Sequence, residues 1–494
     1  MRNLYELVAR CNYIHDLERA WTPIELDQLI NELDLLLPIS RGEIVSFFLP
    51  NSLEFVISFF LIAKKNAIAN PLNPVYTKPE MEFYLSDVGA DIVIVPQSFE
   101  RMSQLKIICA DLNIKMYTIA LDDVGFTVKK HFYASSKRCI DQERGDIALF
   151  LHTSGTTGRP KLVPISHSNI LRTCENITNT LDLQKYDVTY LVMPLFHVHG
   201  LIGALLSSLY SHGSVIIPPK FSASNFWNHF VKLNATWFTA VPTILQILLN
   251  HSFDGDIGQL RFIRSCSSSL APVTLQKLQE KFKVAIVEAY AMTEAAHQIT
   301  SNLRNDVHPG SVGKGRGVGI GIFSLENDVP LPMNSIGQVC IRGSNVISGY
   351  FNNNSANLDS FFTDSSNARW FKTGDLGMID SNGYLTLKGR LKEMINRAGE
   401  KISPLEIDSV LLQHPNVLEA VSFGVPSEMY GQEVEAAVVI NNSISEDDLL
   451  NFLNGKLAKF KIPKRIYIAK SLPKTPTGKI QRRFVAQVFN KSRL

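Results

Sequence analysis

Cysteine is scarce in this chain, and its positions follow no recognisable spacing. The six residues are Cys11, Cys109, Cys139, Cys174, Cys266 and Cys340. None forms a Cys-x-x-Cys pair, and none stands at zinc-ligand spacing to a histidine. The pattern excludes a disulfide framework and a zinc-finger class, and we expect reduced, buried thiols in a reducing compartment.

A hydrophobic run long enough to cross a membrane is also missing. Residues 44–63 form the most apolar stretch, but Pro50-Asn51-Ser52 and Glu54 interrupt it. A membrane span needs roughly 20 consecutive apolar residues. The stretch predicts instead a strand, a turn and an amphipathic helix that begins near Ser52.

The chain as a whole has no large excess of positive or negative charge, because it contains 49 Lys and Arg residues and 46 Asp and Glu residues. With 494 residues, 45% of them hydrophobic, the composition is that of a globular protein of at least two domains. Charge becomes one-sided only from Lys456 onward, with twelve Lys or Arg and no Asp or Glu. This run fits either a nucleic-acid-binding face or a small domain that closes over phosphates. It contains no recognisable RNA-binding motif, and we expect no DNA partner.

The Walker pattern GxxxxGK[ST] is absent, as is a kinase-type glycine loop. Another phosphate-binding pattern is present, and it combines two glycines, four hydroxyl side chains and two cations. It reads Thr153, Ser154, Gly155, Thr156, Thr157, Gly158, Arg159, Pro160, Lys161. Glycines let successive N–H groups converge on an anion. Because an apolar run precedes it and Ser166 can start a helix, we predict a polyphosphate loop between a strand and a helix.

Apolar runs alternate with helix-length segments over the first half of the chain, which favours parallel α/β sheets. The strand candidates are Ile44–Leu49, Ile92–Pro96, Ile147–Leu151, Thr189–Met193, Ser214–Ile217, Trp237–Val241 and Arg261–Ser265. Short strands and Gly/Asn turns between Gly337 and Leu387 predict a small β subdomain. We therefore predict an α/β fold, in which two parallel α/β subdomains and this β subdomain form a large N-terminal domain and a smaller α+β domain follows.

Further blocks occur in the order that is found in the adenylate-forming superfamily, whose phosphate loop the Thr153–Lys161 run resembles. That superfamily comprises acyl-CoA synthetases, firefly-type luciferases and carrier-protein adenylation domains. The matching blocks are Pro194–Gly200, Glu288–Glu294, Trp370–Asp375, Gly389-Arg390 and Pro473–Ile480. Ala291 replaces a glycine that is usual in the second block.

The resemblance implies an AMP-binding domain at 1–391, a mobile C-terminal domain at 392–494 and a hinge at Lys392. It implies that ATP is bound by Thr153, Ser154, Gly155, Thr156, Thr157, Gly158, Lys161, Glu288, Ala289, Tyr290, Thr293, Asp375, Arg390 and Lys479. Catalysis would fall to Lys479, Glu294 and Thr293, with Glu294 holding Mg²⁺. A cation such as Lys479 is chemically required, because a carboxylate must approach a phosphate that repels it.

The implied reaction has two halves. A carboxylic acid first attacks the α-phosphorus of ATP to give an acyl-adenylate and pyrophosphate. The small domain then rotates about Lys392, and CoA, guided past Gly399, displaces AMP. CoA and ATP are thus the expected co-substrates, together with Mg²⁺.

The acid is predicted from the stretches Met193–Leu201, Arg264–Pro272 and Tyr290–His297, which most resemble oxalate–CoA ligases of fungi and plants. Oxalate carries a second carboxylate, and its burial requires donors or cations. The candidate pocket residues are His197, His199, Ser267, His297 and Lys479, with Ser268 and Ser269 beside Ser267. A small aromatic (4-coumarate-like) or medium-chain acid is the alternative.

Three other functions stay open at this stage: a carrier-protein adenylation domain, a luciferase-like oxygenase, and a non-catalytic nucleotide- or RNA-binding protein. Ser492-Arg493-Leu494 resembles the Ser-Lys-Leu peroxisomal address. It predicts a peroxisomal import receptor as partner and a matrix location, with a cytosolic fraction as the alternative.

Overall fold

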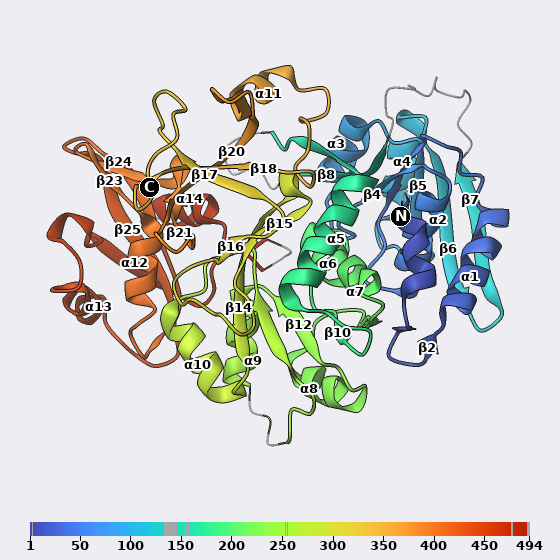
Figure 1. Cartoon of the computed structure of the whole chain (residues 1–494), viewed down its shortest axis with the longest axis horizontal. Helices are drawn as coiled ribbons and strands as arrows, with labels where there is room; N and C mark the ends of the chain where they lie inside the picture. The colour runs from blue at the N-terminus through green and yellow to red at the C-terminus, as the bar shows by residue number, and fades with distance from the viewer. Residues whose placement is uncertain are drawn as a thin grey trace.

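Four β-sheets and their covering helices make up the protein (Figure 1). The computed structural model describes residues 1, 3–132, 146–153, 159–251, 253, 255–475 and 478–491. Figure 1 places the first sheet (blue to cyan) beside the second (green to yellow), with the C-terminal elements (orange to red) at the opposite side.

The first sheet has seven strands in the order β7-β6-β5-β3-β4-β8-β9. Its strands are β3 (Ile44–Phe47), β4 (Ile68–Pro71), β5 (Ile92–Pro96), β6 (Lys115–Asp122), β7 (Gly125–Phe132), β8 (Ile147–His152) and β9 (Leu162–Ser166). The inner strands pair in parallel, whereas β7 and β9 close the two edges as antiparallel strands. Its helices are α1 (Pro23–Leu36), α2 (Leu53–Lys64), α3 (Lys78–Val88) and α4 (Met102–Asp111).

The second sheet has nine strands in the order β16-β15-β14-β13-β12-β10-β11-β1-β2, parallel from β14 through β1. Its strands are β1 (Ile14–His15), β2 (Ala20–Trp21), β10 (Val188–Tyr190), β11 (Ser214–Ile216), β12 (Trp237–Ala240), β13 (Phe262–Ser265), β14 (Ala285–Met292), β15 (His297–Ser301) and β16 (Lys314–Gly315). Its helices are η1 (Leu4–Arg10), α5 (His167–Leu181), α6 (Val198–Gly200), the π-helix η3 (Leu201–Leu206), α7 (Ser207–Tyr210), α8 (Ala223–Lys232), α9 (Pro242–Asn250), α10 (Pro272–Phe282) and the 3₁₀ turn η4 (Thr293–Ala295).

Two smaller sheets follow in the chain. The third contains β17 (Gly319–Phe323), β18 (Gly337–Arg342), β19 (Phe361–Thr363), β20 (Arg369–Ile379) and β21 (Leu385–Arg390), with helix α11 (Asn354–Ser360). The fourth contains β22 (Ile395–Arg397), β23 (Glu400–Ile402), β24 (Val417–Ser427), β25 (Gly431–Ile440) and β26 (Arg465–Ala469). Between and after these strands come η5 (Leu391–Glu393), α12 (Pro404–Leu411), α13 (Glu446–Leu453), η6 (Lys459–Lys461) and α14 (Arg482–Lys491).

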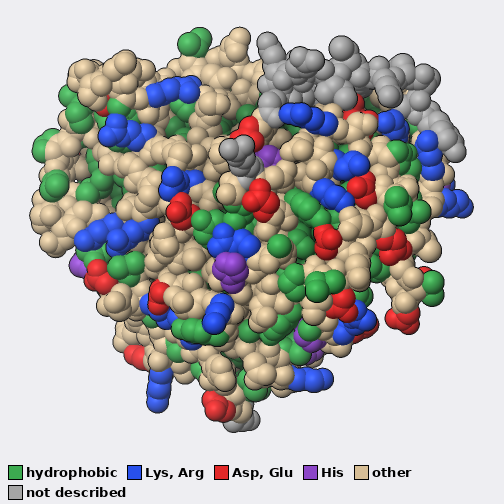
Figure 2. Space-filling view, turned by 45° about the vertical axis from the view of Figure 1, so that its right-hand side comes forward, with side chains coloured by type: hydrophobic (Ala, Val, Ile, Leu, Met, Phe, Trp, Pro, Cys, Tyr) green, Lys and Arg blue, Asp and Glu red, His purple; other side chains and the backbone are tan. Residues whose placement is uncertain are grey.

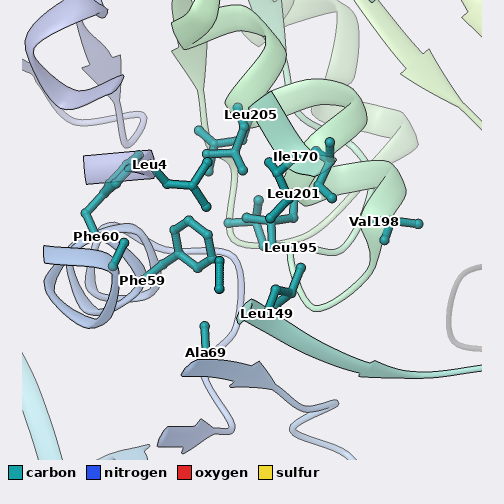
Figure 3. Packing of buried hydrophobic residues seen from close by; sticks show 14 of the residues in the cluster. Leu4, Phe59, Phe60, Ala69, Leu149, Ile170, Leu195, Val198, Leu201 and Leu205 are labelled. Atoms are coloured by element: carbon teal, nitrogen blue, oxygen red, sulfur yellow. The ribbon is translucent and has the colours of Figure 1, made fainter. Parts of the chain in front are cut away.

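The largest hydrophobic cluster joins the two large sheets. Phe59 of α2, Leu149 of β8 and Ile170 of α5 belong to this cluster, as do Val198 and Leu201 (Figure 3). The last two residues belong to the α6–η3 segment. Close packing of this kind holds the segment rigidly at one edge of the second sheet.

The predicted fold class is confirmed, and so are most of the predicted strands. β5 has the predicted bounds, and α2 begins after Ser52, whose hydroxyl accepts from the N–H of Phe55 (3.3 Å). The small β subdomain begins earlier than predicted, because β17 pairs with β18.

One local prediction is wrong. The phosphate-binding run does not lead from a strand into a helix, because β9 intervenes and pairs antiparallel with β8 before α5 begins. The run therefore connects the two strands of a hairpin. Ser166 does cap α5, by accepting from the N–H of Asn169 (3.0 Å).

The cysteines in the described part of the chain are all buried and unpaired: Cys11, Cys109, Cys174, Cys266 and Cys340. Cys139 lies outside the described residues. Among the described helices, none combines the length and apolarity that a membrane crossing requires.

Candidate active site

The carboxyl ends of four adjacent strands of the second sheet bring the predicted site residues together. β10 leads to the segment of His197 and His199, β12 contains Thr239 as its penultimate residue, β13 leads to Ser267, and β14 leads to η4. In open α/β sheets, ligands bind outside this edge. The topology thus explains why blocks far apart in the sequence meet.

The two ends of the phosphate-binding run are tied to each other. Thr153 donates its N–H to the carbonyl of Lys161 (3.0 Å), and the N–H of Lys161 donates to the Thr153 hydroxyl (3.1 Å). Asp87 of α3 fixes the flanks by pairing with His152 (3.0 Å) and with Arg159. The predicted ATP contacts Ser154, Gly155, Thr156, Thr157 and Gly158 lie outside the described residues.

Lys161 and Glu294 are linked through Tyr350. The Lys161 ammonium lies 3.9 Å from the centre of the Tyr350 ring, and the Tyr350 hydroxyl donates to Glu294 Oε1 (2.8 Å). Burial lowers the pKa of Lys161, which the charge of Glu294 opposes. Glu294 is 8% exposed, and none of the described residues forms a hydrogen bond to its second oxygen. A carboxylate oxygen without a protein partner is the donor type that Mg²⁺ takes when it bridges phosphates.

A second carboxylate, Asp375, lies between Tyr290 and Arg390. The Tyr290 hydroxyl donates to Asp375 Oδ2, and Arg390 Nε lies 3.1 Å from Oδ1. Asp375 and Arg390 are register partners of β20 and β21. Burial raises the pKa of Asp375 and the Arg390 charge opposes that rise, while the same pairing raises the pKa of Arg390. A buried acceptor fixed in this way suits the hydroxyl groups of a ribose.

Lys479 lies within electrostatic range of Arg390, Asp375 and Glu294. Burial, followed by the Arg390 charge, lowers its pKa to about 8. The carbonyl of the preceding Gly478 accepts from the Thr243 hydroxyl of α9 (3.0 Å). The C-terminal domain therefore delivers its lysine to the edge of the second sheet in this structure.

Three histidines gather beside Lys479. The His199 and His297 rings stack with centres 5.2 Å apart, and both side chains are fully buried. His199 bonds Thr239 through Nε2 (2.7 Å) and Ser267 through Nδ1 (3.0 Å). His197 caps α6 by accepting from the N–H of His199 (3.3 Å).

Burial disfavours the charged form of all three imidazoles in this cluster. Burial lowers the pKa of His197 to about 3, with Lys479 adding to the effect. It also lowers the pKa of His199 and of His297 well below the usual range, assisted by the Arg264 charge. The cluster offers hydrogen bonds without cationic imidazoles.

His297 is held in a strained backbone conformation. Its φ is 105° and that of Ala296 is 47°, both in the region that disfavours side chains. A Cβ atom at Gly203 would come within 2.4 Å of His297 Nε2, so only glycine fits in the π-helix beneath the ring. π-helical turns often occur at functional sites.

Sequence reasoning missed three residues of this site. They are Arg264, which donates to His297 Nε2 (2.9 Å), together with Thr239 and Tyr350. A signal existed only for Arg264, because an arginine inside the apolar strand pattern Phe262–Ser265 is unusual for a buried strand.

The remaining predicted residues take varied positions. Glu288, Ala289 and Thr293 lie on β14 and η4, and burial raises the pKa of Glu288 to about 8. Ser268 and Ser269 are exposed, so of the predicted hydroxyl cluster only Ser267 reaches the histidines.

Two predicted residues of the C-terminal region lie outside the histidine cluster. Gly399 occupies the exposed turn between β22 and β23, and Lys392 lies in η5 between the third and fourth sheets. Ser492, Arg493 and Leu494 lie outside the described residues.

The basic C-terminal run is partly neutralised by acidic residues of the same domain. Lys461 pairs with Glu406 (2.8 Å) and Lys474 with Glu419 (2.5 Å). On the face shown in Figure 2, Lys and Arg side chains are interspersed with Asp and Glu. Within the run itself, the two ion pairs offset part of the positive charge.

Comparison with known proteins identifies the family of this chain. Residues 17–351 match the AMP-binding enzyme family, and residues 406–479 match the AMP-binding enzyme C-terminal domain. An oxalate–CoA ligase of Saccharomyces cerevisiae is 44% identical, over 92% of this chain and 88% of its own length. One of Arabidopsis thaliana is 46% identical, over 91% of this chain and 89% of its own.

Solved structures match over the full chain. ATP-bound MatB from Rhodopseudomonas palustris is 27% identical with a TM-score of 0.88, covering 99% of both chains. Apo MatB, at the same identity and coverage, gives only 0.76. MenE from Bacillus subtilis in complex with ATP and magnesium is 26% identical with a TM-score of 0.83, covering 98% of this chain and 99% of that one. The chain belongs to the AMP-binding enzyme family and is an AMP-forming acid–CoA ligase.

Proposed function

We propose that the acid is oxalate and that the product is oxalyl-CoA. The observation that carries this proposal is the fully buried polar cluster of His199, His297 and Arg264, which includes a cation. A medium-chain or aromatic acid would require an apolar tunnel at this position. A second carboxylate requires hydrogen-bond donors and positive charge. The similarity to two oxalate–CoA ligases supports the same choice.

In the first half-reaction, Thr153–Lys161 would bind the departing phosphates, while Asp375 and Arg390 orient the ribose. Glu288, Ala289 and Tyr290 would line the adenine side, and Thr293 would contact the α-phosphate. Lys479 would lie between the attacking carboxylate and the α-phosphate, where its charge offsets their repulsion. The second carboxylate would accept from His297 and Ser267, with His199 bonded to Ser267 from behind and His197 beside them.

Magnesium fits the chemistry of Glu294. Bound there with the phosphates, Mg²⁺ would neutralise charge on the departing pyrophosphate. Tyr350 holds one oxygen of Glu294 and thereby directs the other. Among the described residues there is no cluster of three or more His, Cys, Asp or Glu that could hold a metal ion.

In the second half-reaction, the domain of residues 392–494 would turn about Lys392 relative to the domain of residues 1–391. Lys479 would then leave, and Gly399 would approach the pantetheine arm of CoA. A Cβ atom at Gly399 would meet nothing within 4 Å in the present orientation, and its φ of 92° favours glycine. The CoA thiolate would displace AMP from the adenylate.

The test is CoA-dependent AMP release with oxalate, malonate, acetate, octanoate and coumarate. We expect oxalate to give the highest kcat/KM. His297→Ala should reduce the oxalate reaction by roughly 100-fold, since a buried donor to a charged group is lost, while ATP binding is retained. Preference for another acid, or an equal loss of ATP binding in the variant, would contradict the proposal.

We further propose a peroxisomal location, read from Ser492-Arg493-Leu494 and recognised by the import receptor. Fluorescence microscopy of the tagged chain with and without these three residues tests it. Import should require them, and a cytosolic signal for both forms would overturn the assignment.

A further inference from the structure

Arg264 is a buried cation whose partners are all neutral. Its side chain is fully buried on β13, and none of the described Asp or Glu residues pairs with it. The guanidinium donates to His297 Nε2 (2.9 Å), to Gln298 Oε1 (3.2 Å) and, at the longer distance of 3.5 Å, to Thr239 Oγ1. Its Nε has no partner within the described chain. An uncompensated buried charge is strongly unfavourable, so its retention calls for an anion from outside the chain.

The contact with His297 fixes where the imidazole proton lies. A guanidinium can only donate, so Nε2 of His297 must accept. The neutral ring therefore carries its proton on Nδ1. That Nδ1 is buried and has no partner among the described residues. Arg264 thus leaves a buried N–H donor for which none of the described residues supplies an acceptor.

A second series of hydrogen bonds begins at Arg264, and in it too each group can donate to the next one away from the arginine. When Thr239 Oγ1 accepts from Arg264, its own O–H can donate to His199 Nε2 (2.7 Å). His199 then carries its proton on Nδ1 and donates to Ser267 Oγ (3.0 Å). The Ser267 hydroxyl proton is left for an outside acceptor. Hydrogen bonds in such a chain polarise one another.

We propose that Arg264 is a positioning residue of the acid pocket. By donating hydrogen bonds, it determines which nitrogen of His297 and of His199 carries the proton. Both chains end in donors, Nδ1–H of His297 and O–H of Ser267, and a carboxylate has two acceptor oxygens to receive them. The arginine charge completes the match to a second carboxylate and disfavours an amide, which would bring a donor of its own. This inference rests on the proposed function and explains how the same site selects a dicarboxylate.

Oxamate provides the test, because it replaces one carboxylate of oxalate by a neutral amide of nearly the same shape. We would measure kcat and KM for AMP release with both acids in the wild type and in Arg264→Met. In the variant the histidine proton is free to move to either nitrogen. The ratio of kcat/KM for oxalate to that for oxamate should fall by roughly 10- to 100-fold, the range expected for a charge-assisted hydrogen bond. The change should be carried mainly by KM for oxalate.

Matched variants separate this role from a merely structural one. Arg261→Met removes a nearby arginine that pairs with Asp187 instead, so it should leave the acid ratio unchanged. Arg264→Lys keeps a cation that can only donate hydrogen bonds, so it should keep part of the preference for oxalate over oxamate. Thr239→Val removes only the hydrogen bonds that lead from Arg264 to His199, and it should lower the oxalate-to-oxamate ratio several-fold. This variant tests the role of Arg264 if Arg264→Met does not fold.

The outcomes distinguish this inference from the proposed function. An oxalate-active wild type whose folded Arg264→Met and Thr239→Val variants keep the acid ratio overturns the role of Arg264 alone. A wild type that releases no AMP with oxalate overturns the proposed function and this inference with it.

Discussion

At the scale of single residues, Lys479 has the property that its proposed role demands. An ammonium that must lie between two anions has to reach a dry site, and burial there weakens its hold on the proton. The pKa of about 8 follows from burial and from the Arg390 charge, with Asp375 and Glu294 opposing. Lys479 therefore remains mostly charged at neutral pH, but it loses its charge when the pH rises above about 8.

This pKa predicts a pH limit for adenylation. The reactive form is charged, so kcat/KM for pyrophosphate exchange should be level below about pH 8 and fall towards tenfold per unit above it. The fall appears in kcat/KM because that constant reports ionisations of the free enzyme. Lys479→Gln should be slow and should lack this limb. A wild-type profile that stays flat to high pH would contradict the assignment of the limb to Lys479.

The sequence gives no access to the strain and burial of individual side chains. Lys479, Asp375 and Glu294 could be named because each stands in a recognisable block. Arg264 could not be assigned a role, because its contact with His297 joins residues 33 positions apart. That contact requires Arg264 of β13 to reach His297 of β15 across the strand between them, and it requires the positive φ of His297. Sequence periodicity encodes neither feature.

At the scale of elements, helix α14 is joined to the C-terminal domain by the hydrophobic packing of Val485 and by the polar contacts of Arg482. Arg482 contacts Glu393 through Nε (3.1 Å) and Asp408 through Nη2 (2.9 Å), and it also donates to the carbonyl of Ser422. Asp408 is 8% exposed, and burial raises its pKa while Arg482 opposes the rise. Glu393 lies next to Lys392, so the same side chain links the last helix to the proposed hinge.

Arg482→Met should therefore destabilise the C-terminal domain. Removing one partner leaves Asp408 buried without its counter-charge, a change that typically costs about 3–5 kcal/mol of unfolding free energy. Urea denaturation measures the loss. Adding Asp408→Asn should restore part of it, whereas Lys470→Met at an exposed position of the same domain should change stability by about 0.5 kcal/mol or less. A loss of the same size in both single variants would refute the role of the buried pair.

Helices and strands were predicted well where a local sequence pattern defines them, and less well where a strand exists only because it pairs with a neighbouring strand. Buried parallel strands such as β5 read as continuous apolar runs, and α2 and α5 begin at serine caps. β9 was missed because its five residues pair with β8 only after the chain has turned back through the phosphate-binding run. A short antiparallel edge strand leaves little periodicity from which to predict it.

At the scale of the whole molecule, the structure has the orientation that suits adenylation. The TM-score with MatB falls from 0.88 for the ATP-bound form to 0.76 for the apo form, although the sequence compared is equally similar. Lys479 lies near Asp375 and Glu294, and Gly478 packs against α9. Under the proposed mechanism, these are the contacts expected during the first half-reaction.

Thr243 makes one of these contacts and allows the orientation to be tested. Its hydroxyl donates to the carbonyl of Gly478 (3.0 Å), a bond between α9 of the large domain and the residue that precedes Lys479. If the small domain turns before CoA attacks, this bond exists only during adenylation. Thr243→Val should remove about 1 kcal/mol from this orientation alone. Pyrophosphate exchange should then fall roughly fivefold, while thioester formation from supplied oxalyl-adenylate should not slow.

Thr243→Ser, which keeps the hydroxyl, is the matched control and should behave as wild type in both half-reactions. The two assays decide between a contact specific to one orientation and general damage to α9. If Thr243→Val slowed both half-reactions by the same factor, the contact would be serving the fold of the large domain. A selective loss of the first half-reaction would instead mean that the single hydrogen bond at Gly478 helps to hold Lys479 at the α-phosphate until pyrophosphate has formed.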